Sequence, residues 1–272
     1  MVNGMPGKMG IAVAESILGR NWNLVPFSLS GNSKSGQILE VNNHKIELLG
    51  PSVRESKIKE IIQDYPELIV VDYTLPAAVN SNSEFYIKHN LPFVMGTTGG
   101  DRQLMFKSIA QAGLACVIAP NMGKQIVAFQ AMMEYMAKEF PGVFDGYSLK
   151  VEESHQKTKV DTSGTAKAVV SSFNKMGLEQ SVEDIIKYRT DAEAMEVLGV
   201  PEGALKGHAF HTYSLVSKDE TVAFQFKHNV SGRRFYAEGT ADAVGFLAAK
   251  VKSGEKQVFD MVDVLRSRGM EF

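Results

Sequence analysis

The chain opens on the stretch Val2-Asn3-Gly4-Met5-Pro6-Gly7-Lys8-Met9-Gly10, which runs directly into an alanine- and isoleucine-rich segment. A short apolar strand, a glycine turn and a helix N-terminus together make a cradle for a diphosphate, because glycines let the backbone approach the anion and the free N–H groups of the first helical turn face it. The glycine spacing is GxxGxxG rather than GxGxxG, with Pro6 at the position of the second glycine. The stretch predicts a dinucleotide-binding turn, and a strand-to-helix turn without a ligand is the alternative.

Short β-rich apolar runs and amphipathic stretches alternate through the first half of the chain, a pattern typical of a parallel sheet with helices on both faces. Strands are expected at 24–28, 68–72, 92–95 and 115–119, helices at 53–65 and 101–112, and a hairpin at 38–48. The pattern predicts an α/β, Rossmann-like domain with a parallel sheet.

Three further turns follow these strands at their carboxyl ends, where open α/β sheets bind ligands. They are Asp72-Tyr73-Thr74, Gly96-Thr97-Thr98-Gly99-Gly100 and Ala119-Pro120-Asn121-Met122-Gly123. Hydroxyls and small residues at these positions can contact a ribose and a nicotinamide, although glycines and threonines also make ordinary turns. Because the three turns share one edge of the predicted sheet, they favour a nucleotide, and we predict Asp72 and Thr74 among its contacts.

The second half of the chain has a different pattern. Apolar residues alternate over 213–217 and 221–227, which predicts an antiparallel or mixed sheet. A helix is expected over 164–176, with Ser163 placed to cap its start. Another helix over 123–140 connects the two halves, so the second half predicts a smaller α+β domain with a mixed sheet.

Proton donors and cations concentrate just before the helix at 164–176, in the segment Glu153-Ser154-His155-Gln156-Lys157-Thr158-Lys159-Val160-Asp161-Thr162-Ser163-Gly164-Thr165-Ala166. A protonated Lys159 close to His155 can neutralise carboxylates and deliver a proton. The amides and hydroxyls of Ser163-Gly164-Thr165 can hold a carboxylate on the helix dipole. The segment predicts a site for an anionic substrate, with a solvated basic turn and an ordinary helix cap as the alternative.

Composition limits the classes of partner. The 272 residues include 29 Lys and Arg against 31 Asp and Glu, and the net charge of −2 argues against broad attraction to nucleic acid or an anionic membrane. Apolar runs such as 68–71 and 114–119 are far shorter than the ~20 residues that span a bilayer. Cys116 is the single cysteine, so an intrachain disulfide and a cysteine zinc cluster are both excluded, and we expect no metal.

Several motifs together are similar to one family. They are 2–10, 94–99, 119–121, 153–166 and the closing run Phe259-Asp260-Met261-Val262-Asp263-Val264-Leu265. This combination resembles the dihydrodipicolinate reductases, also called 4-hydroxy-tetrahydrodipicolinate reductases, of lysine biosynthesis. Features of the plant-type branch are Phe93-Val94-Met95-Gly96-Thr97-Thr98-Gly99-Gly100-Asp101-Arg102, Met122-Gly123-Lys124-Gln125 and Gly207-His208-Ala209-Phe210-His211.

The resemblance implies an oxidoreductase that uses NADPH or NADH to reduce a cyclic imine dicarboxylate, dihydrodipicolinate, to tetrahydrodipicolinate in the diaminopimelate route. It implies a dinucleotide-binding domain over 1–121 and 239–272, and a domain for substrate binding and oligomerisation over 122–238. It also implies a homodimer or homotetramer, in the cytoplasm if the source is bacterial, or in the plastid stroma if a plant or algal protein has lost a transit peptide.

Carried over by motif, the resemblance gives roles to individual residues. His155 and Lys159 match the catalytic pair, and Gly164 and Thr165, beside Ser163, match the group that grips a substrate carboxylate. The residues that match cofactor contacts are Gly4, Met5, Pro6, Gly7, Lys8, Met9, Gly96, Thr97, Thr98, Ala119, Pro120, Asn121 and Met122.

Two departures from the family pattern bear on substrate and cofactor. Gln156 stands where the usual bacterial motif has a second histidine, and it can donate a hydrogen bond to the substrate but carries no charge. Ser28 stands after the second strand, where an acidic residue that binds the ribose of NADH is expected. The loop 28–35 instead offers hydroxyls, backbone amides around Gly31 and the cation of Lys34, a set suited to a phosphate. We therefore predict Ser28 and Lys34 as cofactor contacts and a preference for NADPH, with a loop indifferent to the cofactor as the alternative.

Two other hypotheses share this architecture. A semialdehyde dehydrogenase needs a nucleophilic cysteine in a polar, accessible turn, whereas Cys116 lies in the apolar run 114–118 and is expected in the core. A non-catalytic dinucleotide-binding or sensing protein of the same fold would have no reason to keep His155, Lys159 and 163–165 together.

Overall fold

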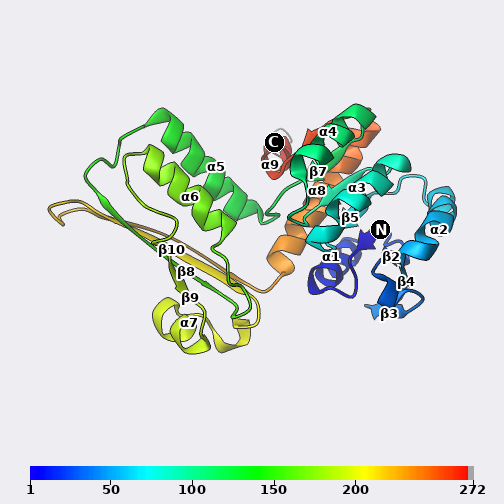
Figure 1. The fold of residues 1–272 in the computed structure, drawn as a ribbon, viewed down its shortest axis with the longest axis horizontal. Coiled ribbons are helices and arrows are strands. Elements are labelled where there is room, and N and C mark those ends of the chain that lie inside the picture. The colour runs from blue at the N-terminus through cyan, green and yellow to red at the C-terminus, as the bar shows by residue number, and fades with distance from the viewer. Residues whose placement is uncertain (269–272) are drawn as a thin grey trace. The chain divides into compact units, whose positions relative to one another are not determined.

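The computed structural model describes residues 1–268, and the chain divides into two units that are described separately below (Figure 1). Unit 1 comprises Met1–Lys124 and the segment that starts at Arg233, and unit 2 comprises Gln125–Gly232. The second crossing lies at 232–233 rather than at the expected 238–239, because residues 234–252 form one continuous helix of unit 1.

A parallel sheet of strand order β1-β5-β6-β7-β12 forms the centre of unit 1. Its strands are β1 (Val2–Asn3), β5 (Val70–Asp72), β6 (Phe93–Met95), β7 (Cys116–Ile118) and β12 (Val258–Phe259). Asn3, Asp72, Met95 and Ile118 occupy one row of the register, so the turns after β1, β5, β6 and β7 leave the same edge of the sheet. The prediction that these turns share one edge is confirmed.

A small separate sheet of order β2-β4-β3 lies beside β1 and contains the predicted hairpin. Its strands are β2 (Phe27–Leu29), β3 (Ile38–Val41) and β4 (His44–Leu49). Its link to β1 is made by the Gly4 N–H, which donates to the Leu29 carbonyl at 3.0 Å, and by the Leu29 N–H, which donates to Oδ1 of Asn3 at 2.9 Å. The expected strand 24–28 begins only at Phe27, after Pro26, which has no N–H to give to a ladder.

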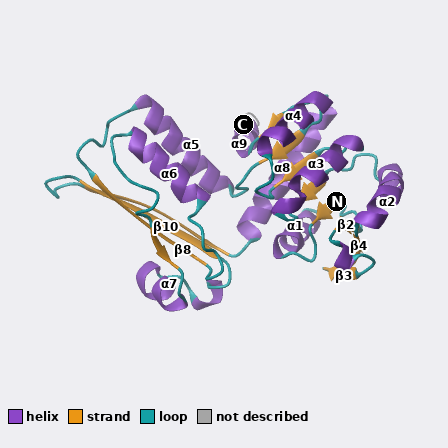
Figure 2. Ribbon diagram, in the orientation of Figure 1, coloured by secondary structure: helices purple, strands orange, loops and turns teal. Residues whose placement is uncertain are grey.

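Helices cover the sheet of unit 1 (Figure 2). They are α1 (Lys8–Gly19), α2 (Pro51–Asp64), α3 (Val79–Lys88), α4 (Arg102–Ala112), α8 (Arg234–Lys252) and α9 (Met261–Arg268), with short 3-10 turns at Asn32–Lys34 and Pro76–Ala78. Helix α1 packs on α8, which also contacts β6 and β7, and α3 packs on α4. The helices expected at 53–65 and 101–112 are confirmed as α2 and α4. Among residues 1–268, no helix is both long and apolar enough to cross a membrane.

Unit 2 is built on a mixed sheet of order β11-β10-β8-β9, as the alternating pattern predicts. Its elements are α5 (Lys124–Glu139, which starts at the last residue of unit 1), β8 (Ser148–His155), α6 (Gly164–Lys175), β9 (Ile186–Tyr188), α7 (Asp191–Leu198), a 3-10 turn (Glu202–Ala204), β10 (His208–Val216) and β11 (Ala223–Ser231). Figure 1 shows α5 and α6 on one side of this sheet and α7 on the other. The core beneath α5 and α6 includes Phe173, Tyr213 and Leu215, whereas Phe210 packs against α7.

Candidate active site

The glycine turn after β1 is shaped by close backbone contacts. Gly4 has a φ of +95°, and a Cβ atom at this position would lie 2.2 Å from the carbonyl oxygen of Tyr73. The Gly7 N–H donates to the Gly4 carbonyl at 2.9 Å, and α1 starts immediately afterwards. Within residues 1–268 no side chain caps the first turn of α1. The turn therefore presents backbone N–H groups in the way that an anion site requires.

Ser28 braces this turn from β2. Its side chain is fully buried, and its Oγ accepts a hydrogen bond of 3.3 Å from the Met5 N–H. Ser30 donates to the Met5 carbonyl at 2.9 Å from the other side. The Ser28 hydroxyl is thus engaged as an acceptor by Met5, and its contact with a cofactor stays a prediction. Lys34 is exposed, in the 3-10 turn that follows β2.

Asp72 holds two of the predicted turns in place through its side chain. Its carboxylate is fully buried, and Oδ1 accepts hydrogen bonds from the Thr74 N–H and hydroxyl and from the Thr97 hydroxyl, at 2.7 to 3.0 Å. Oδ2 accepts from Asn82 at 3.0 Å and from the Tyr86 hydroxyl at 2.6 Å. These donors saturate the carboxylate, which has room for about four. The carboxylate therefore fixes the turns that carry Thr74 and Thr97, and contact between Asp72 and a cofactor stays a prediction.

Tyr73 fills the space between two of the predicted turns. A Cβ on Gly96 would lie 2.4 Å from the Tyr73 ring, so glycine is required where the turn after β6 passes over it. The Tyr73 hydroxyl bonds to the Thr240 hydroxyl of α8 at 2.6 Å, and burial raises the pKa of Tyr73 to about 12. Thr97 is buried and Thr98 is exposed, and Arg102 donates to the Thr97 carbonyl at 2.8 Å.

The turn after β7 is packed against α8. Ala119 and Met122 are buried, while Pro120 is exposed. The Asn121 side chain accepts a hydrogen bond of 2.8 Å from the Gly123 N–H and so closes the turn on itself. A Cβ on Gly239 would lie 1.8 Å from the Met122 carbonyl oxygen, which shows how closely α8 approaches. The structure thus brings all four predicted turns to one edge of the sheet of unit 1.

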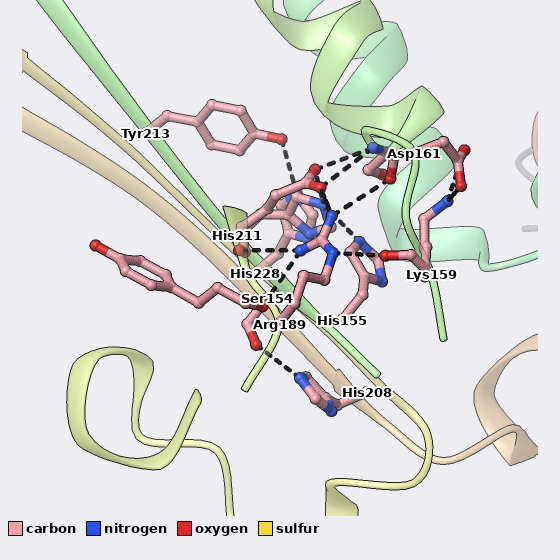
Figure 3. Close-up of polar contacts among 12 residues, drawn as sticks. Ser154, His155, Lys159, Asp161, Arg189, His208, His211, Tyr213 and His228 are labelled. Carbon is pink, nitrogen blue, oxygen red and sulfur yellow. Dashed lines mark hydrogen bonds and ion pairs between the residues drawn. The ribbon is translucent and has the colours of Figure 1, made fainter. Parts of the chain in front are cut away.

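The predicted catalytic pair lies at the end of β8 in unit 2 (Figure 3). His155 is the last residue of β8 and is 8% exposed. Lys159 lies in the following loop, where its Nζ donates to both carboxylate oxygens of Asp161 at 2.9 Å. The Asp161 side chain is 76% exposed, so this ion pair is open to exchange with another carboxylate.

Arg189, which no sequence motif indicated, fixes the loop that carries Lys159. Its Nε donates to the Lys159 carbonyl at 2.7 Å, and one Nη donates to the Asp161 carbonyl at 3.3 Å. The same guanidinium forms an ion pair with Glu153, whose side chain is fully buried. Glu153 also accepts a hydrogen bond of 3.1 Å from the Ser163 N–H. Glu153 and Arg189 together tie the loop to β8.

Ser163 starts α6 as predicted, but its side chain makes no capping hydrogen bond. The expected cap is therefore absent, and the Ser163 N–H donates to Glu153 at 3.1 Å. A Cβ on Gly164 would meet no atom within 4 Å, so the backbone at the start of α6 is open, and Thr165 is the next residue of the helix. Gln156 is half-buried beside His155, and its carbonyl accepts the Lys159 N–H at 2.9 Å.

His155 is surrounded by groups that disfavour its charged form. Burial, together with the positive charges of Arg189 and Lys159, lowers its pKa to about 3. Its Nε2 lies 3.4 Å from Nε2 of His211, a second buried imidazole that is contributed by β10. His208, on the opposite face of β10, bonds instead to the Ser154 hydroxyl at 2.8 Å.

Glu153, His155 and His211 bring one possible metal ligand each to within 4.8 Å of one another. Two of the spacings, 3.4 Å between the histidines and 3.7 Å from His211 Nε2 to Glu153 Oε2, suit a small ion. Arg189 and Lys159 place two positive charges at the same spot, and both oppose a cation. We therefore assign no metal to this cluster.

Cys116 is fully buried in β7, and burial raises the pKa of its thiol to about 12. Such a thiol is not a nucleophile at neutral pH, so the semialdehyde dehydrogenase hypothesis loses its essential residue.

Comparison with known proteins gives consistent results for both units. The family model described as "Dihydrodipicolinate reductase, N-terminus" matches residues 1–122, and the one described as "Dihydrodipicolinate reductase, C-terminus" matches residues 125–265. The chain is 52% identical over 271 residues to "4-hydroxy-tetrahydrodipicolinate reductase 2, chloroplastic" of Arabidopsis thaliana, covering 99% of this chain and 78% of that protein. A reductase from Haloarcula marismortui, named "4-hydroxy-tetrahydrodipicolinate reductase", is 26% identical over 96% of this chain and 98% of its own.

A solved structure has the same fold. "Dipicolinate bound Dihydrodipicolinate reductase from Paenisporosarcina sp. TG-14" aligns with a TM-score of 0.63 at 19% identity, covering 95% of this chain and 96% of that one. The Rossmann-like parallel sheet and the mixed-sheet unit described above are thus both features of a known fold. From the matched families and the identity to the plant enzymes, the chain belongs to the dihydrodipicolinate reductase family of oxidoreductases.

Proposed function

We propose that the chain reduces 4-hydroxy-tetrahydrodipicolinate, by way of its dehydrated form dihydrodipicolinate, to tetrahydrodipicolinate with NAD(P)H and release of one water, in the diaminopimelate route of lysine biosynthesis. The observation that carries the proposal is the combination of a buried His155 and an ionised Lys159–Asp161 pair beside the open N-terminus of α6. This arrangement suits an anionic substrate that must receive a proton. The relatives that match over the full chain bear the name of this activity.

The residues of unit 1 fit a dinucleotide. The Gly4 backbone leaves no room for a Cβ, and the N–H groups at the start of α1 suit a diphosphate. When bound, the nicotinamide supplies the hydride. Gly4, Met5, Pro6, Gly7, Lys8 and Met9 would hold the diphosphate, and Thr74, Gly96, Thr97, Thr98, Ala119, Pro120, Asn121 and Met122 would lie against the ribose and nicotinamide half.

NADPH is the preferred cofactor in this proposal. The support is the lack of a carboxylate at Ser28 and the exposed cation of Lys34 in the turn that follows β2. A carboxylate at this point would bind the ribose hydroxyls of NADH and repel the 2′-phosphate of NADPH. NADH remains a usable second cofactor.

In unit 2, Lys159 and His155 would supply positive charge and a proton as electron density moves onto the ring nitrogen of the substrate. The Lys159 ammonium would exchange Asp161 for a substrate carboxylate, because the Asp161 side chain is exposed. Ser163, Gly164 and Thr165 would hold a carboxylate at the start of α6, where the helix dipole favours negative charge. Gln156 would add an uncharged hydrogen bond.

Three further points belong to the proposal. Unit 1 acts as the dinucleotide-binding domain, and unit 2 acts as the domain for substrate binding and oligomerisation, in a homodimer or homotetramer. The place of action is the plastid stroma if the protein is from a plant or alga, as the chloroplastic plant relatives suggest, and the cytoplasm if it is bacterial.

The test is a reductase assay with enzymatically generated substrate. Oxidation of NADPH and NADH is followed by absorbance, with and without substrate, in the wild type and in Lys159→Ala. Substrate-dependent oxidation that the variant lacks is the expected result. Tight binding of the dinucleotide without any substrate-dependent oxidation would instead favour the non-catalytic alternative.

A further inference from the structure

Four ionisable side chains of unit 2 lie on one face of its sheet. His211 of β10 stands directly opposite Glu153 of β8 on one side and His228 of β11 on the other. His155 follows Glu153 by two residues on the same strand, so its side chain emerges on the same face. Figure 3 shows His155, Arg189, His211 and His228 gathered at this part of the sheet.

The contact between the two imidazoles is specific. Nε2 of His155 lies 3.4 Å from Nε2 of His211, and the rings meet edge to face at 74°. A hydrogen bond between two imidazole nitrogens needs a proton on one nitrogen and a lone pair on the other. If both nitrogens carry a proton the two N–H groups repel, and if neither does the two lone pairs repel. Both side chains are buried, at 8% and 2% exposure, so water does not replace the missing partner.

Glu153 determines how His211 presents this nitrogen. Its Oε2 lies 3.7 Å from Nε2 of His211, while its other oxygen is held by Arg189. A buried carboxylate attracts a proton to the nearest ring nitrogen, and Nδ1 of His211 has no hydrogen-bond partner in the described structure. The proton of neutral His211 is therefore favoured on Nε2, where it points toward His155.

We propose that His211 is a positioning residue for His155: held by Glu153, it shares one proton with His155 and thereby sets the tautomer and the proton affinity of the catalytic imidazole. The proposal rests on the proposed function, in which His155 and Lys159 serve proton transfer to an anionic substrate. The second imidazole at this site comes from β10 and not from the residue after His155, which is Gln156.

The charges around the pair limit it to one shared proton. Lys159 and Arg189 face His155, and His208 adds a further titratable ring. Behind His211 the His228 ring stacks at 4.6 Å, and the Tyr213 hydroxyl bonds to His228 at 3.4 Å. These neighbours and burial disfavour a second positive charge, so the pair titrates as a unit.

The test compares two variants of His211 with a matched control. His211→Gln keeps a side chain that can form a hydrogen bond but cannot carry the proton, and His211→Phe removes both functions. Tyr213→Phe is the control, because Tyr213 lies on the same face of the same strand and its hydroxyl bonds to His228 rather than to His155. Each is measured by kcat, KM for both substrates and the pH dependence of kcat.

We expect both His211 variants to lose about 10- to 100-fold in kcat, which is typical of the loss of a group that orients a reacting residue. KM for the dicarboxylate and for NADPH should stay within about threefold. The limb of the kcat profile that His155 contributes should move to higher pH by about one unit, because the hydrogen bond that His211 donates to neutral His155 is lost. Tyr213→Phe should show the wild-type limb.

Two outcomes overturn the proposal. One is a wild-type kcat and pH limb in His211→Gln, and the other is an equal loss in Tyr213→Phe, which would show a packing effect. If His211→Phe does not fold, ¹⁵N spectra of labelled histidines in His211→Gln provide the test instead. An unchanged tautomer of His155 in these spectra overturns the proposal, and a changed tautomer supports it. His155→Ala and Lys159→Ala test the proposed function separately, because their retained activity would refute the catalytic site whatever His211 does.

Discussion

Arg189 holds Lys159 by the main chain and not by the side chain: its Nε donates a 2.7 Å hydrogen bond to the Lys159 carbonyl oxygen. The Lys159 ammonium can therefore pair with Asp161. The guanidinium also neutralises Glu153, so one residue both positions the loop and allows a carboxylate to be buried.

Replacing Arg189 by Met should destabilise the protein by about 3–5 kcal/mol, because Glu153 would remain as a buried charge without its partner. Urea unfolding at pH 7 measures the loss. In the double variant Glu153→Gln/Arg189→Met much of the stability should return, since no charge is left to bury. A double variant no more stable than Arg189→Met would contradict this account.

Lys159→Ala should lower kcat by about a hundredfold or more, the usual range for loss of a general acid, and should leave NADPH affinity nearly unchanged. The two quantities are measured by steady-state kinetics and by fluorescence titration with NADPH. Lys157→Ala is the control, because Lys157 is an exposed residue of the same loop. Near-normal turnover of Lys159→Ala would refute the catalytic assignment.

Gly4→Ala should cost about 2 kcal/mol or more and should abolish dinucleotide binding, because an alanine at this left-handed position is strained. Gly4 has a φ of +95°, and the new Cβ would have to move the Tyr73 carbonyl oxygen, which lies 2.2 Å away. Gly19→Ala is a matched control, since Gly19 ends α1 on ordinary helical backbone and a Cβ added there would meet no atom within 4 Å. Thermal unfolding and NADPH titration of both variants make the comparison. Normal binding by Gly4→Ala would show that the turn does not need this backbone.

Lys34→Glu should raise KM for NADPH and spare KM for NADH, and the difference should shrink as salt screens the charge. Lys45→Glu makes the same charge change at an exposed position of the hairpin and serves as the control. Equal or higher kcat/KM with NADH in the wild type would refute the NADPH preference, while the reductase activity would be unaffected.

Stability should decrease toward acidic pH because of buried neutral histidines. Burial lowers the pKa of His155 to about 3 and that of His228 to about 4, from an ordinary value of 6.5. The unfolded chain takes up these protons first, so stability is complete above about pH 6.5 and is lost as the pH falls toward the folded-state values. Urea unfolding from pH 7 to pH 4.5 should show this slope, and His228→Gln should reduce it. His44→Gln, at an exposed histidine, should leave the slope as it is.

Much of the fold could be predicted because unit 1 follows local rules. The strands at β5, β6 and β7 are short apolar runs that end in turn residues, and α4 is bracketed by Asp101 and Gly113, which form its caps. Helix α3 has no such signal, because the stretch Val79–Lys88 is largely polar. Two of its polar side chains, Asn82 and Ser83, are nevertheless buried. Its helical form depends on tertiary packing, which a propensity argument does not include.

The residues of the candidate site also divide into those that local sequence patterns predict and those that only the tertiary fold brings together. His155, Lys159 and Ser163 are near neighbours in the sequence, so their association is local and could be predicted. Arg189 and His211 reach Glu153 only through the pairing of β8 with β9 and β10, which no local pattern specifies. A signal was present in β8 itself, where the alternation places Glu153 on the buried face with Val151 and so requires a partner for its charge.

The side chain of Asn3 takes the place of a strand ladder between β1 and the small sheet β2-β4-β3. Few backbone hydrogen bonds would thus need to be rebuilt if the segment 27–49 were exchanged for its counterpart from a relative with another cofactor preference. Such an exchange would test the proposed preference for NADPH, provided that Asn3 is retained.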